Sequence, residues 1–167
     1  MSKNIGNRIV HLYKKNDLKS DYDKDDKCVQ LNVTFNKELG PVVQKVIVRK
    51  GRETKYELMF LTFFNKDSTE FNDEISMDTL DLNYKMTTGC YDRNRETGMT
   101  FFRTNFELND PQELTPGIFK LHINLGFGAI DHFYKDVWKK YFGDDNIPNE
   151  EQTYRPREGN RKDRMFG

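Results

Sequence analysis

The segment from Cys28 to Phe64 constrains the fold more than any other, because three strand-like runs separated by turns follow one another along it. Residues 28–35 alternate between apolar and polar, as expected of a strand with one buried face. PVVQKVIVRK follows a turn and is rich in β-branched residues, and TKYELMFLTFF is apolar on both faces, which is typical of a central strand. The spacing therefore predicts consecutive strands joined by short turns.

Three later segments extend this pattern. A weaker alternation covers 79–86, MTFFRTNFEL predicts a strand over 99–108, and 118–125 follows the turn NDPQELTPG. The segment GCYDRNRETG between them is predicted to be a hairpin tip or a long loop. The predicted fold class is mainly β within α+β, an antiparallel β-sandwich or small barrel of about six strands.

The end of the core is predicted to be one amphipathic helix over 129–142. Its apolar residues fall at helical spacing: Ile130, Phe133, Tyr134, Val137, Trp138 and Tyr141. Gly126 and Gly128 directly before it predict a tight bend between strand and helix. We expect Trp138 to pack on the sheet.

The chain is predicted to form one β-rich domain over 28–143 with extended charged ends. Residues 1–27 are interpreted as an arm and solvated linker that begins with a short amphipathic segment, or as a frayed terminus. Residues 144–167 lack apolar periodicity and are interpreted as a charged tail. Lys plus Arg and Asp plus Glu both number 27, so any nucleic-acid binding must come from a local patch.

The sequence contains no recognisable set of catalytic or ligand-binding residues, which favours a protein that is not an enzyme and binds no cofactor or metal. The GFGAID segment has Asp131 where a dinucleotide-binding loop needs its third glycine. His122 and His132 are predicted to lie on polar faces of a strand and a helix that need not meet, which argues against a zinc site. Neither Cys90 nor any serine lies in a nucleophile motif.

The composition bears on the source of the chain. Ala129 is its single alanine, whereas Asn, Lys, Asp and Phe are abundant, a bias typical of AT-rich genomes. The block from KYELMFLTFF to NDPQELTPGIFKLHINL resembles immunoglobulin-like attachment domains of phage baseplate and fibre proteins, in the order strand, acidic loop, strand and Pro-Gly turn into a final strand. It covers less than half of the chain, and it implies a sandwich fold and a role in virion attachment.

These observations predict a structural or adaptor protein for protein–protein assembly, of phage or viral origin, as a virion or tail component. One alternative is a phage inhibitor that binds a host replication or defence protein. Another is a single-stranded nucleic-acid-binding β-barrel, which the zero net charge disfavours. The expected partner is a protein, in a homo-oligomer or larger assembly. No membrane is expected, and the location is host cytoplasm or virion.

Basic residues in turns and in the tail are the candidate contacts to a partner or to nucleic acid, and Tyr56, Tyr91 and Phe101 are candidate stacking rings. The candidate basic positions are Arg49, Lys50, Arg52, Arg93, Arg95, Arg155, Arg157, Arg161, Lys162 and Arg164.

Overall fold

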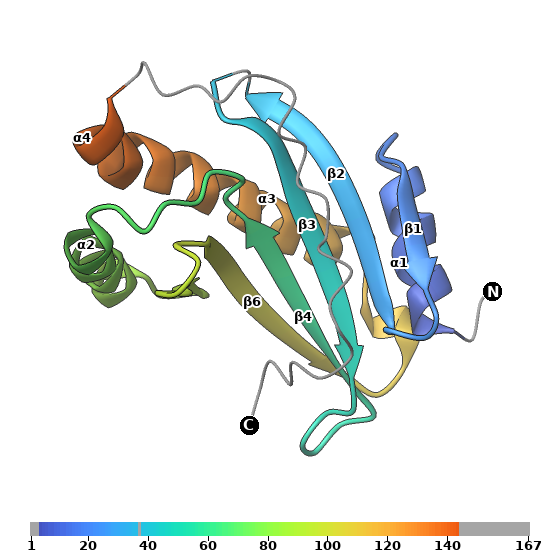
Figure 1. Ribbon diagram of the computed structural model, residues 1–167. Helices are drawn as coiled ribbons and strands as arrows, with labels where there is room; N and C mark the ends of the chain where they lie inside the picture. Colours follow the sequence, from blue (N-terminus) through green and yellow to red (C-terminus); the bar gives the residue numbers. More distant parts are fainter. Residues whose placement is uncertain (1–3, 37, 144–167) are drawn as a thin grey trace.

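The computed structural model describes residues 4–36 and 38–143, which form one antiparallel sheet with helices packed on one face (Figure 1). The strand order is β1-β2-β3-β4-β6-β5. The strands are β1 (Ser20–Asp23), β2 (Cys28–Asn36), β3 (Gly40–Arg49), β4 (Tyr56–Phe63), β5 (Cys90–Arg93) and β6 (Thr100–Leu108). The helices are α1 (Ile5–Lys14), α2 (Asn72–Lys85) and α3 (Pro116–Phe133), with a short 3₁₀ turn η1 (Pro111–Glu113) before α3.

The last helix is longer than α3 alone. A π-helical turn, η2 (Tyr134–Trp138), follows α3 without a break, and α4 (Lys139–Phe142) completes it. Within the described part of the chain, none of these helices is both long and apolar enough to cross a membrane.

The predicted class is confirmed: the fold is mainly β within α+β, with six antiparallel strands and a long C-terminal helix. The strands β2, β3, β4 and β6 occupy segments predicted from alternation, and α1 occupies the predicted amphipathic segment. The described strands form a single open sheet, so they build neither the sandwich nor the barrel. Layers of helix on one sheet face bury the apolar side chains in place of a second sheet.

Two segments predicted as strands are helical. The alternating residues of 79–86 lie on two different faces of a helix. In α2, Thr79 and Leu82 are buried, whereas Leu80 and Tyr84 are exposed. The segment 118–125 lies inside α3, so the attachment-domain resemblance loses its final strand. The start of α3 carries N-terminal helix signals, with Thr115 as cap and Pro116 in the first turn.

Two strands lie where none was predicted. β1 is part of the segment interpreted as a solvated linker, and it pairs with β2. β5 is part of the segment interpreted as a loop, and it pairs with β6. Both are four residues long and form the two edges of the sheet, so alternation within them is too short to detect.

The glycines of GFGAID do not form a bend, because both lie inside α3. Gly126 is the point of close approach between α3 and the sheet. A Cβ atom there would collide with the Thr62 hydroxyl and would lie 3.0 Å from the Gln44 Nε2 atom. A Cβ atom at Gly128 would meet open space. Gly126 therefore permits the packing of α3 on β3 and β4.

The core forms two clusters on the helical face of the sheet. In the first, α1 and the start of α3 pack on β2, β3 and β4, with Leu12 and Phe119 fully buried. In the second, α2 and the end of the long helix pack near β5 and β6. Trp138 lies in this second cluster and is 4% exposed, with its ring 4.9 Å from that of Phe64.

Candidate functional sites: helix α2 and a basic pocket

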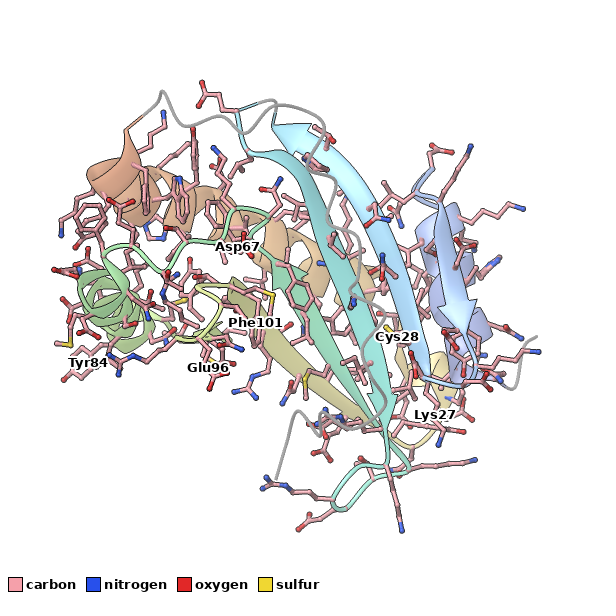
Figure 2. All side chains as sticks on the ribbon, in the orientation of Figure 1. Lys27, Cys28, Asp67, Tyr84, Glu96 and Phe101 are labelled. Carbon is pink, nitrogen blue, oxygen red and sulfur yellow. The ribbon has the colours of Figure 1, made fainter. Side chains whose placement is uncertain are left out.

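The outer face of α2 carries the three most exposed of the large hydrophobic side chains among the described residues. Met77 is 61% exposed, Leu80 60% and Tyr84 94%. Their spacing of i, i+3 and i+7 places them along one stripe of the helix. Figure 2 shows Tyr84 pointing away from the sheet. We call Met77, Leu80 and Tyr84 the α2 stripe.

The inner face of α2 buries little. Ile75, Thr79 and Leu82 are its buried residues, and the Thr79 hydroxyl donates to the Ile75 carbonyl of the same helix. A helix with so small an apolar face is stabilised mainly by tertiary contacts. At the start of α2, its N-cap residue Phe71 packs on the rings of Tyr141 and Phe142. Polar contacts also hold α2 in place.

Asn83 fastens the end of α2 to the edge strand β5. Its side-chain amide donates to the Tyr91 carbonyl at 2.8 Å, and its side-chain oxygen accepts from the Tyr91 backbone N–H at 2.6 Å. The Tyr91 hydroxyl in turn donates to the Ala129 carbonyl of α3 at 2.7 Å. One asparagine therefore connects α2 to the sheet, and Tyr91 connects that strand to α3.

Arg93 fastens the start of α2. Its guanidinium donates to the Asn72 side-chain oxygen at 3.0 Å, and also to the Ser68 carbonyl, the Gly98 carbonyl and the Thr100 hydroxyl. Burial lowers the pKa of Arg93 below its ordinary value, and the five-donor fork of arginine suits this set of acceptors. Arg93 thus supports the local structure, whereas the sequence predicted it as a partner contact.

Asp78 joins the middle of α2 to α4. One carboxylate oxygen accepts from the Lys140 ammonium and from the Tyr141 hydroxyl, each at 2.8 Å. Partial burial raises the pKa of Asp78, but the hydrogen bonds from Lys140 and Tyr141 outweigh it and hold the pKa below its ordinary value. The polar contacts of Asn83, Arg93 and Asp78 fix α2 with its apolar stripe facing outward.

Carboxylates border the α2 stripe. Asp73, Glu74 and Asp81 are exposed on the outward side of the helix. Arg95, a predicted partner contact, forms an exposed ion pair with Asp73 and therefore belongs to this border. The outer face of α2 is thus apolar along its centre and acidic at its edges.

A basic pocket lies toward the opposite edge of the sheet. It has a volume of about 610 Å³ and lies between the start of α1, the β1–β2 turn, the end of β3 and the start of β4. Five of its ten lining residues are cationic: Lys24, Lys27, Arg49, Lys50 and Lys55. The other five are Asn4, Ile5, Tyr22, Val48 and Tyr56, so none is acidic. Figure 2 marks its position by Lys27.

The lysines of this pocket differ from several other cations of the described residues, which pair with carboxylates. Lys135 pairs with Asp131, Lys140 with Asp78, and Arg103 with Asp92. No ion pair within residues 4–36 and 38–143 involves Lys24, Lys27, Lys50 or Lys55. Lys55 instead lies over the Tyr56 ring, with its ammonium 5.3 Å from the ring centroid. The pocket therefore concentrates positive charge in a chain whose net charge is zero.

The structure brings together only part of the predicted contact set. Arg49 and Lys50 line the basic pocket. Arg52 is exposed in the β3–β4 turn and does not line it. Tyr56 also lines it, but Tyr91 is 2% exposed and cannot act as an open stacking ring. The other predicted positions, Arg155, Arg157, Arg161, Lys162 and Arg164, lie outside the described residues.

The histidines do not converge on one site. His132 pairs with Asp136 at 2.6 Å on the exposed side of the long helix. His122 is buried, contrary to its predicted position on a polar strand face, because it lies on the inner side of α3. Its ring stacks on Phe60 and its Nδ1 lies 2.9 Å from the Thr104 hydroxyl. Among the residues with described positions, no group of three His, Cys, Asp or Glu side chains could hold a metal ion.

Comparison with known proteins assigns no family to the chain: no family model matches it, and no curated protein matches its sequence. Its function must therefore be argued from its own surfaces.

Both surfaces include residues that the sequence reasoning missed. The α2 stripe was hidden by the interpretation of 79–86 as a strand, although the spacing of Met77, Leu80 and Tyr84 fits a helix equally well. The pocket residues Lys24, Lys27 and Lys55 come from two places in the sequence, the β1–β2 turn and the residue before β4. Only the pairing of β1, β2, β3 and β4 brings them together, and no local motif announces it.

Proposed function

We propose that this chain is a non-enzymatic adaptor that binds a protein partner through the outer face of α2. The observation that carries the proposal is the α2 stripe, where Met77, Leu80 and Tyr84 are each at least 60% exposed on a helix fixed to the fold. Large apolar side chains gathered on one surface are typical of protein-binding sites. Tyrosine is also enriched among the residues that dominate binding energy.

The chemistry of this face specifies the partner. An apolar stripe with acidic borders fits an apolar groove whose rim carries Lys or Arg side chains, the helix-in-groove mode of recognition. Because Asn83, Arg93 and Asp78 already fix the helix, binding requires little ordering of the backbone. The role in assembly and the source in a phage or virus are part of the proposal, and the AT-rich composition supports that source.

The same surface serves either a virion component or an inhibitor of a host protein. In both cases one protein partner occupies the α2 stripe, in host cytoplasm or in the virion. A second copy of the chain would be that partner if the α2 stripe drives self-association. Light scattering after size exclusion, on the wild type and on a Leu80→Ser variant, separates self-association from binding of another protein.

Site-specific photo-crosslinking tests the surface directly. A photoreactive amino acid at position 80 is compared with one at position 121, because Leu121 is 55% exposed on α3 and provides a matched exposed leucine elsewhere. We expect one protein to crosslink at position 80 and none at position 121. Equal crosslinking at the two positions, or no crosslinking at position 80, would contradict the proposal.

A further inference from the structure

We propose that the basic pocket binds a nucleotide, with its phosphates on the lysines and its base against the tyrosine rings. This site is separate from α2 and goes beyond the proposed adaptor function. The two surfaces lie toward opposite edges of the sheet, since the pocket adjoins β1 whereas α2 contacts β5.

The charge of the pocket points to phosphate. Four lysines that have no ion pair among the described residues face one pocket, and no carboxylate lines it. Such a concentration of like charge destabilises the free protein, and a polyanionic ligand relieves it. Phosphate groups carry more charge per group than carboxylates and offer three acceptor oxygens to the ammonium donors.

The backbone around the pocket adds to this preference. Residues at the start of α1, Asn4 and Ile5, line it, so the positive end of the helix dipole is directed toward it. The first turn of α1 contains no acidic residue that would compensate this dipole. A helix start together with four exposed lysines around one open pocket gives a combined environment for phosphate.

Lys27 occupies an unusual backbone conformation in the pocket wall. Its φ of 49° lies in the left-handed region, which a residue with a Cβ adopts rarely. The Val48 N–H donates to the Lys27 carbonyl at 2.9 Å and holds the turn against the end of β3. Strained positions of this kind cluster at ligand-binding sites. Lys27 lines the same pocket as Lys50.

Two aromatic rings specify a nucleotide rather than phosphate alone. Tyr22 and Tyr56 both line the pocket and are half-buried. Tyr22 is held against α1, because a Cβ atom at Gly6 would collide with its ring. Bases stack on such rings with little sequence preference. A volume of about 610 Å³ is within the usual range for a small-molecule site.

The test is calorimetric titration of the full-length protein with ADP and with inorganic pyrophosphate, both without metal ions. We expect ADP to bind with a Kd below about 1 mM, and to bind at least about 5-fold more tightly than pyrophosphate because its base stacks. A 5′-phosphorylated oligothymidine serves as a second probe. If it binds more tightly than ADP, the natural ligand is a single strand; if ADP binds more tightly, it is a free nucleotide.

Variants separate the two contributions. The double variant Lys27→Gln/Lys50→Gln should weaken the binding of ADP and of pyrophosphate alike, by at least about 10-fold. Tyr56→Leu should weaken the binding of ADP by about 5-fold or more and leave the affinity for pyrophosphate unchanged. Tyr56→Phe keeps the ring and should bind ADP as the wild type does. Lys85→Gln, at the end of α2, is the matched control and should bind as the wild type does. Thermal melting of each variant confirms that it folds.

Three results would overturn the proposal. The first is no saturable binding of ADP or of the oligonucleotide. The second is ADP binding that the lysine double variant leaves intact. The third is polyglutamate binding as tightly as ADP, which would show that the pocket recognises negative charge on a peptide.

Discussion

The helices α2 and α3 pack on the same face of one sheet, but they are held by different forces. α3 and its extension bury large apolar side chains, among them Phe119, Phe133 and Trp138. α2 buries only Ile75, Thr79 and Leu82 and depends on side-chain hydrogen bonds to β5 and α4. A helix of the first kind belongs to the core. A helix of the second kind leaves its larger apolar residues outside, where a partner can reach them.

The largest effect tests the core helix. Trp138→Ala should lower the free energy of unfolding by about 3–5 kcal/mol, because it removes a buried ring from the second cluster. Urea denaturation monitored by circular dichroism measures this. Leu121→Ala removes an exposed side chain from the same helix and should change stability by less than about 0.5 kcal/mol. An unchanged midpoint for Trp138→Ala would show that the helix does not pack on the sheet.

Two glycines that lie two residues apart, on opposite sides of α3, sharpen the account of how this helix packs. Gly126→Ala should destabilise by about 1–3 kcal/mol, since its methyl group collides with Thr62. Gly128→Ala should stabilise by about 0.5–1 kcal/mol, because alanine favours the helix and the added methyl meets open space. Thermal melting of the pair gives shifts of opposite sign. Shifts of the same sign would contradict the close approach at Gly126.

The next effect tests the attachment of α2. Asn83→Ala should destabilise by about 1–2 kcal/mol, because it leaves the backbone N–H and carbonyl of Tyr91 without their side-chain partner. Hydrogen exchange followed by mass spectrometry should show faster exchange in α2 and β5, with α1 unchanged. Asn124→Ala on the exposed side of α3 is the control. Unchanged exchange in α2 would mean that other contacts hold the helix.

The smallest effect is pH-dependent. The pKa of Asp78 is lower in the folded than in the unfolded state. The ionised carboxylate therefore stabilises the fold above the unfolded pKa of about 3.9, and this stabilisation is lost as the pH falls through the folded value. At neutral pH, Asp78→Asn should therefore lower the free energy of unfolding by less than Asn83→Ala does. The difference in free energy of unfolding between Asp78→Asn and the wild type should shrink in acid. Denaturation at several pH values measures it. A difference that is constant with pH would rule out the ionised carboxylate as the cause.

Prediction from the sequence succeeded where β-branched and apolar residues at strand spacing determined the secondary structure. Burial alternates along the described start of β2 and the second half of β3, and it is nearly continuous in β4, whose two faces are both apolar. Prediction failed for α2, whose stripe of Met77, Leu80 and Tyr84 made both faces of the helix apolar and so imitated a strand. It also failed for α3, because Phe119 and Leu121 suggested alternation although His122 is buried and Leu121 exposed.

The candidate sites were less predictable than the fold. Arg49 and Lys50 were identified as basic positions, but the pocket around them also needs the β1–β2 turn and Lys55. These segments meet through antiparallel pairing over long sequence separations. The structural role of Arg93 was missed for a related reason, since its four acceptors come from Ser68, Asn72, Gly98 and Thr100. The charge of a residue identifies it as a candidate, but the topology of the fold determines which groups its side chain contacts.

The affinity of the crosslinked partner for two leucine variants tests the central claim most directly. Leu80→Ser and Leu121→Ser both remove an exposed leucine, at 60% and 55% exposure, and neither should alter the fold. We predict that Leu80→Ser weakens binding at least about 10-fold, while Leu121→Ser binds within about 2-fold of the wild type. Equal affinities for the two variants would contradict the assignment of α2 as the docking surface.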